Sequence, residues 1–196
     1  MKELLDQLKE LIIHKEYRKI KKLLEEADKY IKGKLFEEFL AMLFEGNGFI
    51  ATIKGGAFDG GADILLSYPS NPNKIVWIVQ AKNYLNPLNN SDIIAELKKF
   101  EKKASKEYNC RQFMIISLNG YIENIRLFNK TNMSLEDFKF LQVLIDNYSE
   151  EQNRDILLPD LKPHNRYTYK EVKAILENEK RLPVYDIETS NGMETD

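Results

Sequence analysis

Asp59-Gly60-Gly61-Ala62-Asp63 leads into one expected strand, and Gln80-Ala81-Lys82 ends the next one along the chain. The apolar residues 64–66 and 75–79 predict these two strands. Successive side chains of a strand point to opposite faces, so Gln80 and Lys82 share a face that Ala81 does not. If the two strands pair as a hairpin, a carboxylate, an amide oxygen and an ammonium meet at one end of a sheet. We expect a divalent cation beside a phosphodiester to suit such a place.

The neighbouring segments predict a mixed α/β sheet with helices on both faces. Residues 34–44 read as a helix, and 49–53, 62–68 and 74–82 read as three strands of an antiparallel meander. A helix over 91–106, capped by Ser91, then crosses over to a fourth strand at 112–117. The strand over 74–82 is the most hydrophobic, which places it in the centre of the sheet.

The two ends of the chain read as additions to this core. Residues 1–32 predict a helical arm with a possible break near 14–16, residues 33–148 the core, and residues 149–196 a C-terminal extension. Within the core, 121–130 is a candidate short helix, and Ser134 is expected to cap another helix. The extension holds one short helix starting near Thr168, whose Thr168-Tyr169-Lys170-Glu171 is a capping box, and a frayed tail over 188–196.

Composition limits the classes of protein that fit. The 196 residues are 43% hydrophobic, which is enough for a sizeable core. The single cysteine, Cys110, excludes an internal disulfide, and His14 and His164 are too few for a histidine-built metal site. With no long apolar run and no signal-peptide pattern, we expect a protein of the reducing cytoplasm and no membrane segment. The net charge of −2 does not indicate nucleic acid by itself.

The residue types at the expected strand ends fit phosphodiester hydrolysis. That reaction needs a cation to neutralise phosphate charge, a deprotonated water and a cationic group near the transition state. Mg²⁺ prefers oxygen ligands and takes only one or two protein carboxylates. Asp63 is the expected main ligand, the Ala81 carbonyl and the Gln80 amide oxygen are further ones, and Glu37 reaches the metal through water. Lys82 is placed to hold the attacking water, and Mn²⁺ is expected to replace Mg²⁺.

Three stretches, Gly33-Lys34-Leu35-Phe36-Glu37, Asp59-Gly60-Gly61-Ala62-Asp63 and Val79-Gln80-Ala81-Lys82, resemble the Mrr-like branch of the PD-(D/E)XK nucleases. The resemblance covers about residues 33–130 and implies a restriction endonuclease-like core of helix, three-strand antiparallel meander, crossover helix and fourth strand. It implies Asp63 as metal ligand, Gln80 as the variant of the second acid in a QxK motif, Lys82 as catalytic lysine and Glu37 as the helix acid. It also implies Mg²⁺-dependent DNA cleavage, often in restriction or phage defence.

Several polar residues near these motifs are candidates for DNA contact. They lie in the glycine-rich loop, in the loop after Lys82 and on the crossover helix, and are Lys54, Asn83, Tyr84, Lys98 and Lys102. The helix lysines also fit the solvated face of an amphipathic helix, and the loop residues fit ordinary loop composition.

Each motif residue also has a structural interpretation. Asp63 is typical of a turn, Lys82 of a solvated strand end, and Gln80 of a hydrogen bond at a sheet edge. Glu38 competes with Glu37, since the two lie about 100° apart around a helix and cannot face one site together.

The hypothesis that follows is a Mg²⁺-dependent endonuclease acting on DNA, in the double-stranded form, in restriction or defence. Cutting both strands needs two sites, so a homodimer is expected. Two alternatives stay open: a structure-selective nuclease of DNA repair or recombination, and a DNA-binding module whose degraded site does not cut. The sequence does not indicate whether a methyltransferase or helicase partner exists.

Overall fold

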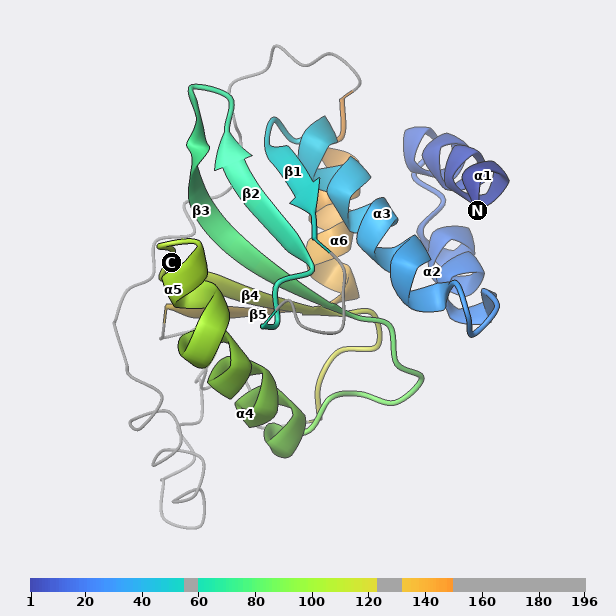
Figure 1. Ribbon diagram of the computed structural model, residues 1–196. Coiled ribbons are helices and arrows are strands. Elements are labelled where there is room, and N and C mark those ends of the chain that lie inside the picture. Colours follow the sequence, from blue (N-terminus) through green and yellow to red (C-terminus); the bar gives the residue numbers. More distant parts are fainter. Residues whose placement is uncertain (55–59, 123–131, 150–196) are drawn as a thin grey trace, which may run out of the picture.

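The computed structural model describes residues 1–54, 60–122 and 132–149 (Figure 1). The helices are α1 (Lys2–Ile13), α2 (Tyr17–Glu26), α3 (Lys32–Gly46), α4 (Asn90–Lys99), α5 (Ser105–Glu107) and α6 (Phe138–Asp146). The strands are β1 (Ile50–Ile53), β2 (Ile64–Tyr68), β3 (Asn71–Lys82), β4 (Phe113–Ser117) and β5 (Met133–Glu136). One π-helical stretch, η1 (Phe100–Ala104), joins α4 to α5.

These strands form one mixed sheet in the order β1-β2-β3-β4-β5. The first three are antiparallel, as a meander requires, while β3 pairs with β4 and β4 with β5 in parallel. The crossover from β3 to β4 runs through α4, as expected for parallel neighbours. The predicted fold class, the meander and the central position of β3 are therefore confirmed.

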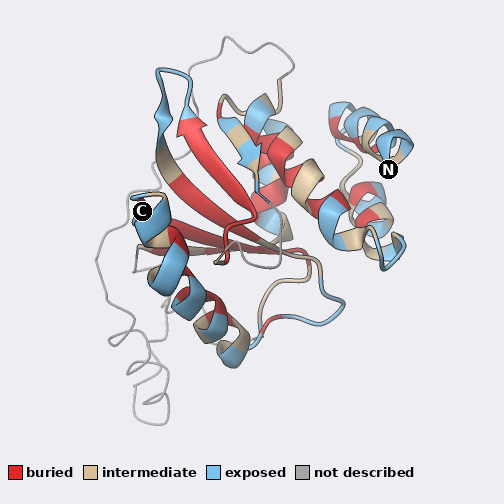
Figure 2. Cartoon of the chain, in the orientation of Figure 1, coloured by how far each residue is buried: buried red, intermediate tan, exposed pale blue. Residues whose placement is uncertain are grey.

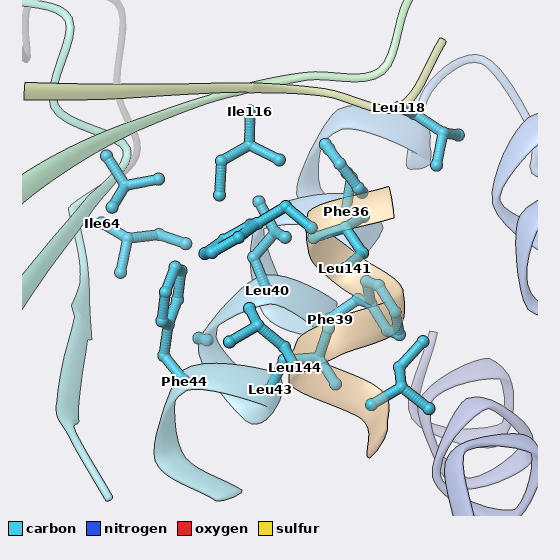
Figure 3. Packing of buried hydrophobic residues seen from close by; sticks show 14 of the residues in the cluster. Phe36, Phe39, Leu40, Leu43, Phe44, Ile64, Ile116, Leu118, Leu141 and Leu144 are labelled. Atoms are coloured by element: carbon cyan, nitrogen blue, oxygen red, sulfur yellow. The ribbon is translucent and has the colours of Figure 1, made fainter. Parts of the chain in front are cut away.

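Helices cover both faces of the sheet, and each face has its own apolar layer. On one face, α3 and α6 pack onto Ile64, Ile116 and Leu118, as Figure 3 shows. On the other face, α4 and η1 cover a second cluster that includes Leu65, Ile78 and Ile115. Strands β2 and β4 are almost entirely buried, and β3 is buried over residues 77–80, whereas the edge strand β1 and the start of β3 are not buried (Figure 2). The C-terminal end of β3, after Gln80, is one of the places where residues of the central strands can meet solvent and ligands.

The N-terminal segment is a helical hairpin, and the predicted break near residues 14–16 is confirmed. Lys15, between α1 and α2, has a φ of 54°, a left-handed conformation that ends a helix. The apolar residues of the hairpin, Leu8, Ile12, Ile20 and Leu24, are all buried in the same cluster as α3. The division of the chain at residues 32 and 149 stays a prediction.

Two predicted helix caps are wrong. The N-cap of α4 is Asn89, which accepts hydrogen bonds from the backbone N–H groups of Ser91 and Asp92 in a capping box, so the helix begins before Ser91. Ser134 lies in β5 and caps no helix; the N-cap of α6 is Asp137, which accepts from the Lys139 N–H at 2.8 Å. A four-residue parallel strand has too short a pattern to be recognised without its partner β4.

Several predictions fall outside the described residues. These are most of the candidate helix over 121–130, the helix expected from Thr168 and the tail over 188–196. In the part of the chain that the structure describes, none of the helices combines the length and apolar character needed to cross a bilayer.

Candidate active site

Asp63, just before β2, and Gln80, in β3, lie opposite each other on neighbouring strands. Asp63 directly precedes β2, and its backbone N–H donates to the Val79 carbonyl at 2.9 Å, which extends the β2–β3 pairing by one residue. The Gln80 side-chain amide and the Ala81 backbone N–H both donate to Asp63 Oδ2, the latter at 2.7 Å. Asp63 and Gln80 are each only 6% exposed. The Asp63 carboxylate is thus fixed by two donors from the neighbouring strand.

Lys82 ends β3 on the same face as Gln80. Its Nζ lies 2.9 Å from Glu96 Oε1 and 5.6 Å from the centre of the Tyr84 ring. Burial alone would lower the pKa of Lys82, but the hydrogen bond and charge of Glu96, with smaller contributions from Tyr84 and Asp63, outweigh it and raise the pKa above its usual value. Lys82 is therefore a cation at neutral pH, suited to holding a water or a phosphate oxygen rather than to acting as a base.

Glu96, on α4, is a member of this group that the sequence interpretation missed. It is 7% exposed, and its Oε1 accepts from both Lys82 and Lys99 at 2.9 Å. The available signal was its position: Glu96 lies between Ile93 and Leu97 on the face of α4 that packs against the sheet. From the sequence, only lysines of this helix are candidates for a function.

The glycine turn before Asp63 packs directly against the crossover helix. A Cβ atom at Gly60 would lie 2.9 Å from Lys103 Cβ, and one at Gly61 would lie 3.5 Å from Lys99 Cβ. Both glycines have left-handed backbone angles, with φ of 71° and 86°. Glycine is needed here for conformation and for close approach. The contact also places Lys99 and Lys103 beside the turn, on a different face of the helix from the predicted Lys98 and Lys102.

Replacing Gly61 by alanine is expected to damage both stability and the site. The new Cβ would take a strained φ of 86° and lie 3.3 Å from Gln80 Oε1, next to Asp63. We expect a loss of about 1–3 kcal/mol in the free energy of unfolding and at least a tenfold slower reaction at the site. The matched control is Gly33→Ala in α3, where a Cβ meets nothing within 4 Å. Thermal unfolding and plasmid cleavage measure both; equal behaviour of the two variants would contradict this description.

Glu37 and the Ala81 carbonyl are the other predicted metal ligands. Glu37 is half-buried on α3, and α3 packs on the sheet face opposite α4 (Figure 1). Its role at a metal stays a prediction. The Ala81 backbone contributes its N–H to Asp63, and its carbonyl as a ligand also stays a prediction.

The candidate DNA-contacting residues differ in how available they are. Lys98 and Lys102 are exposed on α4 and η1, and Lys54 is exposed with its Nζ 5.6 Å from the Tyr108 ring centre. Tyr84 is 52% exposed beside Lys82. Asn83 is different, because its Nδ2 donates to the Leu24 carbonyl at 2.9 Å. That bond ties the end of β3 to α2, which gives Asn83 a structural role.

The donor set at this end of the sheet fits a hard divalent cation better than a soft one. The described residues contain no group of three or more His, Cys, Asp or Glu side chains that could hold a metal. Two carboxylates lie in this region: Asp63, which accepts from the Gln80 amide, and Glu96, whose Oε2 lies near the Gly61 turn. Among the described residues, the buried Glu96 Oε2 has no hydrogen-bond partner. Mg²⁺ accepts such a sparse oxygen set, because it keeps several of its waters.

Comparison with known proteins bears on the same part of the chain. A family model described as a restriction endonuclease, the Mrr catalytic domain, matches residues 29–145. That range contains α3, α4 and the five strands that the described residues form, and it nearly reaches the end of α6. No curated protein and no solved structure matches the chain.

Proposed function

This chain belongs to the restriction endonuclease family, and from that premise we propose that it is a Mg²⁺-dependent endonuclease that hydrolyses DNA at Asp63, Gln80 and Lys82. The observation that carries the proposal is the convergence of these three side chains at one end of the β2–β3 pair. Asp63 and Gln80 touch, and the charges of both Asp63 and Glu96 act on the Lys82 ammonium.

The chain's own residues can be given roles in this reaction. Asp63 presents a carboxylate whose Oδ2 is oriented by the Gln80 and Ala81 donors. A divalent cation held by Asp63 would neutralise charge at the phosphate and lower the pKa of a water bound to it. Lys82, as a cation, would orient the attacking water and offset the negative charge that grows on the phosphate oxygens. Burial of Asp63 and Gln80 strengthens these electrostatic effects, because bulk water screens them less.

The proposed biological setting is restriction or defence against foreign DNA. A single centre cuts one strand, so we propose a homodimer as the form that cuts both strands of duplex DNA. Exposed lysines on α4 and η1, among them Lys98 and Lys102, lie on the helix that also carries Glu96, and we propose that they contact the DNA backbone. Size measurement in solution together with the ratio of nicked to linear product tests the dimer.

Cleavage of a supercoiled plasmid tests the activity itself. The purified chain should produce nicked and linear DNA with Mg²⁺ or Mn²⁺, and excess EDTA should abolish the reaction, because Asp63 and Lys82 alone cannot activate water. Cleavage that persists in EDTA would contradict a metal-dependent centre. DNA binding without cleavage in any divalent cation would favour the non-cutting module, and cleavage limited to branched DNA would favour the repair nuclease.

A further inference from the structure

We infer that Glu96 supplies the second carboxylate of this centre, from helix α4 rather than from strand β3. The inference rests on the proposed function and adds one residue to it. In the sequence, the position expected for a second acid is Gln80, whose amide is neutral. A neutral oxygen holds a divalent cation less tightly than a carboxylate does. The question is therefore whether another carboxylate reaches the same space.

Geometry at Gly61 answers that question. The point where a Gly61 Cβ would stand lies 3.3 Å from Gln80 Oε1 and 3.7 Å from Glu96 Oε2. Two oxygens from different elements, a strand and a helix, therefore border one small space beside the glycine turn. The nitrogen of the same Gln80 amide donates to Asp63, so one side chain reaches from Asp63 to the space beside Gly61 that Glu96 Oε2 also borders.

Both ion pairs of Glu96 use the same carboxylate oxygen, Oε1. Oε1 accepts from Lys82 and Lys99, whereas Oε2 is buried and lacks a hydrogen-bond partner among the described residues. Leaving a buried carboxylate oxygen without a partner costs stability. A purely structural ion pair gives no reason for that arrangement. An oxygen directed at a cation site does, since the cation would satisfy Oε2 while Oε1 keeps Lys82 in place.

The immediate surroundings of Glu96 suit such a double role. The Lys99 side chain is 56% exposed, whereas that of Lys82 is only 12% exposed. The more buried partner of Glu96 is therefore Lys82, the catalytic candidate. The backbone after Glu96 changes to the π-helical η1, within which Phe100 and Ala104 stay buried. Glu96 is thereby held on a well-packed part of the crossover helix, one turn before this irregularity.

Binding of Mn²⁺ to the DNA-free protein tests the inference without relying on activity. Titration followed by electron paramagnetic resonance of free Mn²⁺ should show that Glu96→Gln weakens binding about tenfold or more. The control is Glu107→Gln, which removes the same charge from the exposed surface of α5 and should bind Mn²⁺ as the wild type does. Thermal unfolding of each variant without metal checks that the fold is kept.

A second variant, Lys82→Ala, tests whether Glu96 is a metal ligand or only an ion-pair partner of Lys82. Under this inference Lys82→Ala should bind Mn²⁺ at least as tightly as wild type, because it removes a positive charge and keeps both carboxylates. Wild-type Mn²⁺ affinity in Glu96→Gln, or equal weakening by Lys82→Ala, would overturn the role of Glu96. The outcome is distinct from failure of the proposed function: a chain that binds Mn²⁺ through Glu96 and cuts no DNA rejects only the nuclease.

Discussion

Lys82→Ala should retain the fold and DNA binding while losing cleavage by about 10²–10⁴-fold, the usual contribution of a positioned charged or proton-transferring group. The physical reason is that no described neighbour replaces its ammonium. Lys99 also contacts Glu96, but its side chain is 56% exposed and lies on the helix rather than at the end of β3. The fold should persist because Glu96 keeps Lys99 as a charge partner.

The matched control for Lys82 is Lys74→Ala. Lys74 is an exposed lysine on the same strand, β3, towards its other end, so its removal changes net charge equally and leaves the site intact. Single-turnover plasmid cleavage and DNA binding in Ca²⁺ would be measured for both variants. Cleavage by Lys82→Ala at the rate of Lys74→Ala would reject the lysine assignment. The raised pKa of Lys82 also means that its charge should persist through neutral and mildly alkaline pH.

Asp63→Asn should abolish both metal binding and cleavage, with a rate loss of about 10³-fold or more, since a metal at a phosphoryl centre contributes several kcal/mol to transition-state stabilisation. The substitution nearly preserves shape. The asparagine carbonyl oxygen can still accept from the Gln80 amide and the Ala81 N–H, which now meet at Oδ2. The missing feature is the negative charge, and the fold should stay close to that of the wild type.

Asp6→Asn on α1 is the control for that variant, because it removes a carboxylate from an exposed position away from the sheet. Mn²⁺ titration and cleavage in Mg²⁺ are the two readouts. Retained Mn²⁺ binding with lost cleavage would move Asp63 from the metal to another role. Retained cleavage would remove it from the centre altogether.

Local patterns predicted the part of the site that depends on two neighbouring strands. Asp63 opposite Gln80, and Lys82 on the same face, follow from a hairpin and the alternation of side chains along β3. The sequence predicts a glycine-rich loop before Asp63, but the close packing of Gly60 and Gly61 on Lys99 and Lys103 depends on where α4 lies. Strand alternation contains no information about that distance.

The features that were missed depend on contacts between distant segments. Glu96 lies 14 residues after Lys82 in the chain, and only the packing of α4 on the sheet brings the two side chains together. The strand β5 has four residues and is defined by its parallel pairing with β4. At the start of α4, both Asn89 and Ser91 are good cap residues, and the deciding feature was Asp92, which completes a capping box with Asn89 only.

The most direct test of the central claim is the position of a cation in crystals of this protein soaked with Mn²⁺. An anomalous difference map should show one peak about 2.0–2.5 Å from an Asp63 carboxylate oxygen, on the side that also faces Gln80 and Lys82. A map whose Mn²⁺ peaks all lie away from Asp63, in crystals of a protein that still cuts DNA, would contradict a centre built on the ends of β2 and β3.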